Sequence, residues 1–232
     1  MPPDARPQFA AVLAFVIFPV CTAAQTEPSK HAVSDGAVMA QLVALRDSFV
    51  SQIKAAGFQP GLPPPEIILD DQPSFGAYDP RKNVVHVAVW DALRPEQQAG
   101  FAGFFGQGQK GEQAFDETVY HWVFTHELGH WWQECRHKAV ESHYSLEIDA
   151  SRIAAAYWRW KDSAFMEVTA KRIAAVSEST QGLVPADQHS EKYFDENYLK
   201  LGLTPGFIWF QCDMVSKVVA EQPLPSFRQT LE

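Results

Sequence analysis

The segment VFTHELGHWW, residues 123–132, places two histidines and a glutamate inside an otherwise apolar sequence. The apolar side chains in and just before it are Val119, Trp122, Val123, Phe124, Leu128 and Trp131. Their density predicts a helix that is largely buried. Buried imidazole and carboxylate groups cost free energy unless they have partners. Any fold of this chain must therefore satisfy these three polar side chains within a packed interior.

On a helix, His126 and His130 project from the same face, one turn apart. Their ring nitrogens could then bind one metal ion. Glu127 is rotated by about 100° from His126, so we expect it to lie over the open side of that ion and hold a water molecule. This arrangement predicts a hydrolytic zinc centre, with the carboxylate as the proton acceptor. The alternative is a solvated polar stripe on a core helix.

The chain has 232 residues, of which 46% are hydrophobic, and this is ample for one domain. Its net charge of −9, carried by scattered acidic residues, disfavours a nucleic-acid partner. The apolar run 9–20 follows Arg6 and precedes the small residues Thr22 and Ala24. This pattern predicts a signal peptide over residues 1–24, with a buried N-terminal helix as the alternative. We therefore expect a secreted or periplasmic protein, cleaved near Ala24, whose residues 25–232 form a single domain.

The remaining sequence alternates between apolar periodicities and turn signals. The spacing predicts helices over 36–56, 112–135 (or 116–135), 145–161 and 163–179, and from about residue 205. It predicts a strand at 65–71 and a hairpin at 74–90 whose turn is DPRKN. Residues 95–111 are predicted to form a short helix followed by a loop, and a further loop precedes the last helix.

The pentad HELGH resembles the H-E-x-x-H signature of zincin metallopeptidases. This resemblance implies that His126 and His130 are zinc ligands and that Glu127 is the general base. Metzincins continue with a glycine and a third histidine, but Gln133 and Arg136 occupy those positions here. The gluzincin branch, which takes a glutamate from a second helix, fits better.

The second helix offers Glu147 and Asp149, which lie about 200° apart on a helix, so only one can face the metal. We choose Glu147 because it shares a face with the small residues Ala150, Ser151 and Ala154, which allow a close approach. Asp149 is the main alternative. Glu141 and His143 lie just upstream as further alternatives.

The stretch also resembles the E-x-x-A-D/N pattern of small gluzincin-like peptidases. In that pattern the Glu is a ligand and the Asp or Asn buttresses a ligand histidine. Ser151 stands at the position of the buttress, and Asp149 is an alternative for that role.

The same resemblance implies an edge strand above the metal, for which the hairpin at 74–90 is the candidate, and an oxyanion-stabilising residue downstream. Tyr198 and Tyr193 are the catalytic candidates for this second role, with His189 as another. The alternative is that the tyrosines are packed aromatic residues. Cys135 and Cys212 could form one disulfide in an exported chain, or remain two buried thiols.

These features together predict an α+β, zincin-like fold: a small sheet with an edge strand packed on an active-site helix, followed by a mainly helical C-terminal part. The expected function is that of an exported zinc-dependent peptidase. We expect a monomer that acts on a peptide or protein substrate, with no nucleic-acid partner and no membrane span in the mature chain. The alternatives are a catalytically silent envelope binding protein and a zinc hydrolase of a non-peptide substrate.

Overall fold

The computed structural model describes residues 31–70, 75–106, 110–137, 141–202 and 204–232. The signal peptide predicted over residues 1–24 lies outside this part of the chain. Within it, a small sheet and a larger set of helices confirm the expected α+β class, with helix predominating. No helix of the described ranges has the length and apolar character needed to cross a membrane.

The sheet contains β1 (Glu66–Asp70), β2 (Gly76–Asp79) and β3 (Val84–Ala88) in the order β1-β3-β2. β3 pairs parallel with β1 and antiparallel with β2, which confirms the predicted hairpin. Asn83 ends the turn with a φ of 56°, a left-handed conformation that asparagine tolerates better than most residues. β2 is therefore an edge strand of this sheet.

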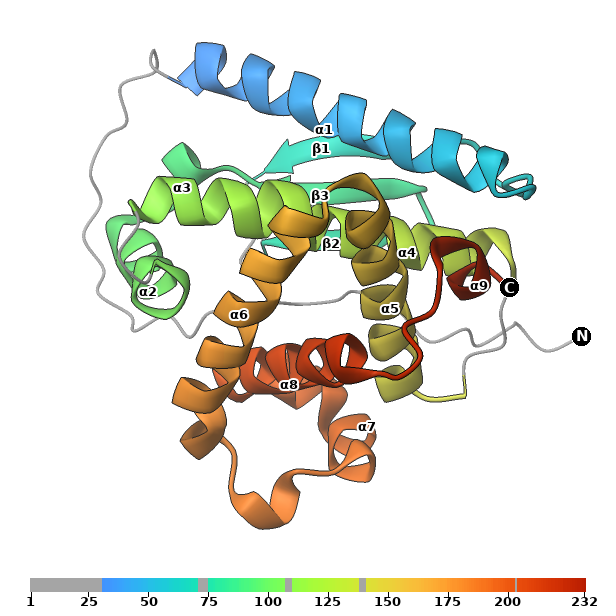
Figure 1. The fold of residues 1–232 in the computed structure, drawn as a ribbon. Helices are drawn as coiled ribbons and strands as arrows, with labels where there is room; N and C mark the ends of the chain where they lie inside the picture. The colour runs from blue at the N-terminus through green and yellow to red at the C-terminus, as the bar shows by residue number, and fades with distance from the viewer. Residues whose placement is uncertain (1–30, 71–74, 107–109, 138–140, 203) are drawn as a thin grey trace, which may run out of the picture.

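Two helical layers enclose the sheet (Figure 1). The helix α1 (His31–Ala55) lies along one side, with Leu42, Leu45, Phe49 and Ile53 in the core. A continuous rod lies on the other side and consists of α3 (Gly111–Phe115), the π-helical η2 (Asp116–Val123) and α4 (Phe124–Cys135). The predicted long helix is thus present, but its middle is wound as a π-helix, a form that often accompanies functional sites.

The remaining helices lie beside and below this rod in Figure 1. They are α2 (Pro95–Phe105), α5 (His143–Lys161), α6 (Ser163–Thr180), α7 (Glu191–Leu201), α8 (Gly206–Ala220) and α9 (Phe227–Thr230), with short 3-10 turns η1 (Trp90–Ala92), η3 (Gln181–Leu183) and η4 (Ala186–Gln188). Asp162 separates α5 from α6, because its carboxylate accepts a hydrogen bond from the amide of Phe165 at 2.9 Å and caps the second helix.

The prediction of a loop before the last helix is wrong for residues 191–201, which form the helix α7. Ser190 caps it by accepting a hydrogen bond from the amide of Tyr193. Phe194, Tyr198 and Leu201 are spaced by four and three residues, and they bury one face of the helix in a second aromatic cluster with Phe207 and others from α8. The polar residues between them mask this helical periodicity in the sequence.

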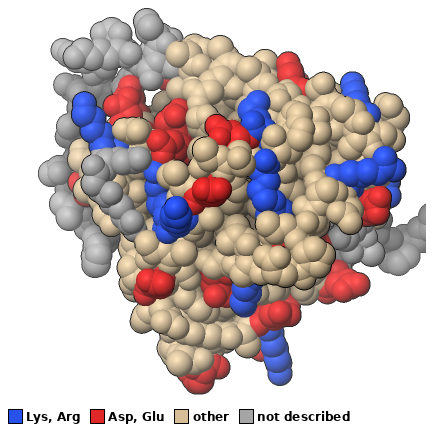
Figure 2. Space-filling view, in the orientation of Figure 1, with Lys and Arg blue, Asp and Glu red and all other residues tan. Residues whose placement is uncertain are grey.

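Acidic and basic side chains are interspersed over the face of the molecule shown in Figure 2. No block of a single sign stands out on this face. This distribution agrees with the scattered charges of the sequence.

Candidate metal centre

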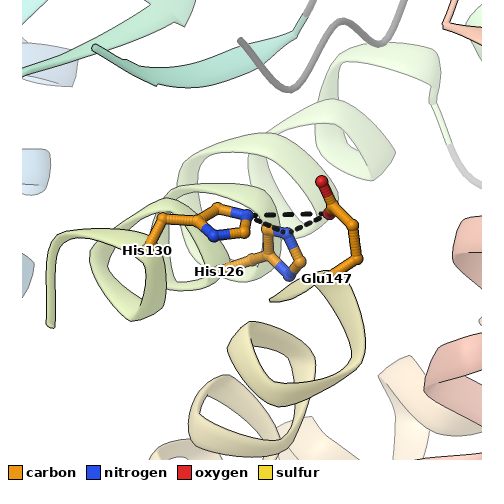
Figure 3. A group of neighbouring side chains, drawn as sticks. All are labelled: His126, His130 and Glu147. Carbon is orange, nitrogen blue, oxygen red and sulfur yellow. Dashed lines mark hydrogen bonds and ion pairs between the residues drawn. The ribbon is translucent and has the colours of Figure 1, made fainter. Parts of the chain in front are cut away.

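His126 and His130 on α4 meet Glu147 on α5 (Figure 3). Oε2 of Glu147 lies 3.1 Å from Nε2 of His126 and 3.6 Å from Nε2 of His130. The two histidine Nε2 atoms are themselves 3.1 Å apart. All three ligand atoms lie within 4.8 Å of one another, so the group could hold a metal ion. The side chains are buried, with exposed fractions of 7%, 9% and 1%.

The close packing of α4 on α5 makes this meeting possible. Gly129 lies between the two histidines and faces Ala150, one turn after Glu147. A Cβ atom on Gly129 would lie 3.0 Å from the carbonyl oxygen of Ala150 and 3.3 Å from its Cβ. The small side chains at both positions therefore let the helix backbones approach closely, as the small-residue face of the second helix predicted.

Gln133 fixes the proton on one imidazole. Its amide nitrogen donates to the carbonyl oxygen of Leu146 at 2.9 Å, so its amide oxygen must face Nδ1 of His130, also at 2.9 Å. An amide oxygen only accepts hydrogen bonds, and Nδ1 of His130 therefore carries a proton. In the neutral ring, Nε2 then presents a lone pair toward His126 and Glu147.

Ser151 holds the other imidazole. Its Oγ lies 3.2 Å from Nδ1 of His126, a distance that suits a hydrogen bond from the ring N–H. The serine thus occupies the place where the resembled pattern has an acid or amide. Asp149, the alternative for both roles, instead forms an ion pair with Arg152, whose guanidinium also lies 2.6 Å from Glu221.

The electrostatics of the group favour a positive charge at its centre. Burial by itself raises the pKa of Glu147, but the two histidines more than offset it and hold that pKa well below its ordinary value. Burial lowers the pKa of His130, but the Glu147 carboxylate outweighs it and raises that pKa to about 9. Without a metal ion, the site therefore retains a proton at neutral pH.

Glu127 lies beside the group without belonging to it. Its Oε2 accepts a hydrogen bond from the backbone amide of Tyr78 on β2 at 2.9 Å, and its exposed fraction is 2%. Burial raises the pKa of Glu127, the two histidines oppose this shift, and Glu147 adds to it. The edge strand thus holds the carboxylate that the sequence singled out as the candidate base.

Two further side chains hold Glu147, both far downstream in the sequence. The Tyr198 hydroxyl donates to Oε1 at 2.7 Å, and the Gln211 amide donates to Oε2 at 3.0 Å. Burial, followed by the Glu147 charge, raises the pKa of Tyr198 well above its ordinary value. Sequence reasoning missed Gln211, because a single glutamine on an apolar helix carries no motif.

The structure does not bring the other candidates to this group. Tyr193 stacks on Phe210 with ring centroids 6.4 Å apart. His189 stacks on Trp209 at 3.9 Å and bonds to the carbonyl oxygen of Val184. Neither residue lines the pocket beside the metal centre.

That pocket is open-sided, and its empty space, counted together with the solvent at its mouth, is about 690 Å³. One wall carries His126, Glu127 and Glu147, and the neutral polar side chains in its lining are Thr118 and Gln211. The other lining residues are Phe75, Gly76, Phe101, Phe105, Val119, Trp122, Val123, Ile173, Phe207, Ile208, Cys212 and Val215. The pocket thus has ionisable side chains on one wall and mostly apolar side chains on the others.

Both cysteines in the described residues are buried free thiols. Burial raises the pKa of Cys135 to about 11 and that of Cys212 to about 12, so both stay protonated at neutral pH. Of the two alternatives predicted for this pair, a disulfide or two buried thiols, the structure shows two buried thiols.

No protein-family model, curated protein or solved structure matches this chain. The kind of site present is therefore indicated by its own residues alone. It is a buried group of two histidines and one glutamate that could hold a metal ion, with a further carboxylate and an apolar pocket beside it.

Proposed function

We propose that this protein is a zinc-dependent peptidase of zincin-like type. The observation that carries the proposal is the convergence of three electron-pair donors, from His126, His130 and Glu147. These lone pairs repel one another unless a proton or a metal ion lies between them. Of these residues, His126 and Glu147 also line an open pocket. Two imidazole nitrogens and one carboxylate oxygen are a ligand set common in catalytic zinc sites, which keep a further position open.

The hydrogen bonds around the ligands support this assignment. Gln133 and Ser151 bond to the Nδ1 atoms of His130 and His126, which leaves both Nε2 atoms available to a metal ion. Such supporting bonds orient the ligands and raise their basicity. When bound, the ion would supply Lewis-acid polarisation of a carbonyl group and of the attacking water.

Glu127 is then the residue that moves protons. Its carboxylate accepts a proton from the attacking water and delivers it to the amine that leaves. The raised pKa of Glu127 suits this exchange, because a more basic carboxylate takes a proton more readily. The backbone amide of Tyr78 keeps Oε2 in place.

The surroundings favour a peptide substrate with a large apolar side chain. β2 is an edge strand, and its residue Gly76 lines the pocket beside Glu127. An extended peptide can pair with such an edge through its backbone. The apolar walls around Phe101 and Phe207 would then take a side chain next to the scissile bond. Export remains part of the proposal and depends on residues 1–24 as a signal peptide.

The test combines metal analysis with substitution of the base. Purified protein should hold one zinc ion, and Glu127→Gln should keep that ion while losing hydrolysis of a peptide library. Glu134→Gln, on the same helix but outside the pocket lining, is the matched control and should remain active. A metal-free wild-type protein that gains no zinc on titration would overturn the proposal. A zinc-loaded protein that cleaves only non-peptide esters or amides would favour the alternative hydrolase.

A further inference from the structure

We propose that Gln211 is a catalytic residue whose side-chain amide donates a hydrogen bond to the substrate carbonyl oxygen during hydrolysis. This inference rests on the proposed peptidase function. It assigns to α8 a role that the sequence had led us to expect of a tyrosine. Three observations carry it: the position of the amide, its spare donor capacity and the placement of the competing side chains.

The amide of Gln211 lies at the centre of the site and at the surface of the pocket. Its nitrogen is 3.0 Å from Oε2 of Glu147, the same oxygen that faces His126 and His130. Gln211 also lines the pocket, between the apolar side chains of Phe207 and Ile208 and that of Val215 on the same helix. A carbonyl group that enters the pocket to reach the metal ligands therefore passes close to this amide.

The amide also has a donor to spare. A glutamine side chain carries two N–H groups, and the bond to Glu147 uses one of them. Among the residues that the structure describes, Gln211 makes no other side-chain hydrogen bond. One N–H can thus hold the ligand carboxylate while the second remains available to a bound substrate.

The other candidates are committed or distant. The Tyr198 hydroxyl donates to Oε1 of Glu147, on the opposite side of that carboxylate from the histidines, and Tyr198 is absent from the pocket lining. Thr118, another neutral residue of the lining, lies eight residues before His126, in the π-helical η2. Of the side chains that line the pocket in the described part of the chain, Gln211 is the neutral donor that bonds directly to a member of the ligand group.

An amide suits this task on electrostatic grounds. As water attacks, negative charge develops on the carbonyl oxygen, and a fixed donor beside it gains strength as that charge grows. The apolar side chains around Gln211 exclude water and so increase this effect. The amide carries no charge to repel the ligand group, and it does not change protonation near neutral pH.

The experiment compares Gln211→Leu with wild-type protein on one fluorogenic peptide that has phenylalanine next to the scissile bond. Ser216→Ala, on the same helix but outside the pocket lining, is the matched control. We expect kcat to fall by about 100- to 1,000-fold, as when a single oxyanion donor is lost, with KM changed by less than about threefold because the interaction forms in the transition state. Melting temperatures show whether each variant folds.

Two binding measurements separate this role from mere support of Glu147. Zinc affinity, measured by chelator competition, should change by less than about threefold in Gln211→Leu, because a bound ion would itself become a partner of Oε2 while Tyr198 still holds Oε1. In a Glu127→Gln background, calorimetry should show that Gln211→Leu weakens a phosphonate analogue of the peptide by at least about tenfold. The parent amide peptide should bind unchanged, since the phosphonate alone imitates the charged tetrahedral state.

The outcomes distinguish the two proposals. If wild-type protein cleaves peptides and Gln211→Leu keeps its kcat, the role of Gln211 is overturned while the peptidase function stands. If the loss of activity in Gln211→Leu disappears at saturating zinc, the residue only positions a ligand, and the inference is again wrong. If zinc-loaded wild-type protein cleaves no peptide, both proposals fall together.

Discussion

The hydroxyl oxygen of Ser151 lies 3.2 Å from Nδ1 of His126, on the side of the ring opposite Glu147. Ser151 has an exposed fraction of 0% and follows Glu147 by one turn of α5. One helix therefore supplies both a candidate ligand and the side chain that orients another. A neutral hydroxyl in this position can accept a hydrogen bond from the ring N–H without adding a second buried negative charge.

Ser151→Ala should weaken zinc binding by about 10- to 100-fold, because loss of a partner that orients a ligand histidine has effects of this size. The fold should persist, since alanine fits the space and favours the helix. Competition with a chromophoric chelator measures the affinity. Ser51→Ala, at an exposed position of α1, is the control and should leave it unchanged. Equal affinities in the two variants would exclude an orienting role for Ser151.

The contact between Gly129 and Ala150 leads to a second prediction. The methyl group of Gly129→Ala would press on the backbone of Ala150 at 3.0–3.1 Å and force α4 and α5 apart. We expect a loss of about 1–3 kcal/mol in the free energy of unfolding, typical of overpacking, together with weaker zinc binding as Glu147 moves away from the histidines. Denaturant titration measures the first effect and chelator competition the second.

Gly103→Ala provides the control for this substitution. Gly103 is also helical, but a Cβ atom there meets nothing within 4 Å. Alanine should therefore stabilise the protein by about 0.4–1 kcal/mol through its better helix propensity. If Gly129→Ala behaves like Gly103→Ala, the close approach of the helices does not determine the geometry of the site.

Local patterns in the sequence account for the part of the site that lies on α4 and the start of α5. The spacing of His126 and His130 defines a shared helix face, and the small residues after Glu147 indicate a close helix contact. The hairpin, with its turn signal, predicts the antiparallel pair that contains the edge strand. Each of these features depends on residues that are close together in the sequence.

The features that sequence reasoning missed depend on packing between distant segments. Gln211 reaches Glu147 across a separation of 64 residues, and no periodicity marks it. The sequence makes Tyr198 a candidate, but it does not indicate that the Tyr198 hydroxyl bonds to Glu147. That bond depends on how α7 packs against α5. The pocket is built from β2, α2, η2, α4, α5, α6 and α8, so its shape is a property of the tertiary fold. Propensity likewise gives no sign that η2 is a π-helix.

The hydrogen bond from Tyr198 to Oε1 of Glu147 gives a third prediction. Tyr198→Phe removes a donor to a buried carboxylate, and such a loss typically costs about 1.5–3 kcal/mol. We expect lower stability of the metal-free protein and weaker zinc binding. Tyr193→Phe is the control and should change neither, since the Tyr193 ring stacks on Phe210 and the hydrogen bond to Glu147 comes from Tyr198. A Tyr198→Phe variant with normal zinc affinity and a selectively lower kcat would instead favour the oxyanion role predicted from the sequence.

The pairing of His130 with Glu147 predicts how the stability of the metal-free protein depends on pH. An unfolded histidine has a pKa of about 6.5, whereas in the folded protein Glu147 outweighs the effect of burial and raises the pKa of His130 to about 9. The folded state therefore binds the proton more tightly. This contribution to stability is complete below about pH 6.5 and is lost as the pH rises towards 9. Thermal unfolding of chelator-treated protein should show a falling melting temperature across this range.

Zinc should reverse that trend, because the ion competes with the proton for Nε2 of His130 and binds more tightly as the pH rises. The melting temperature of zinc-loaded protein should therefore hold or increase between pH 6.5 and 9. His130→Gln removes the titrating group and should flatten the pH dependence of the metal-free protein, while His121→Gln, on the same helical rod but outside the ligand group, should retain it. A metal-free protein that becomes more stable from pH 6.5 to 9 would contradict the pairing of His130 with Glu147.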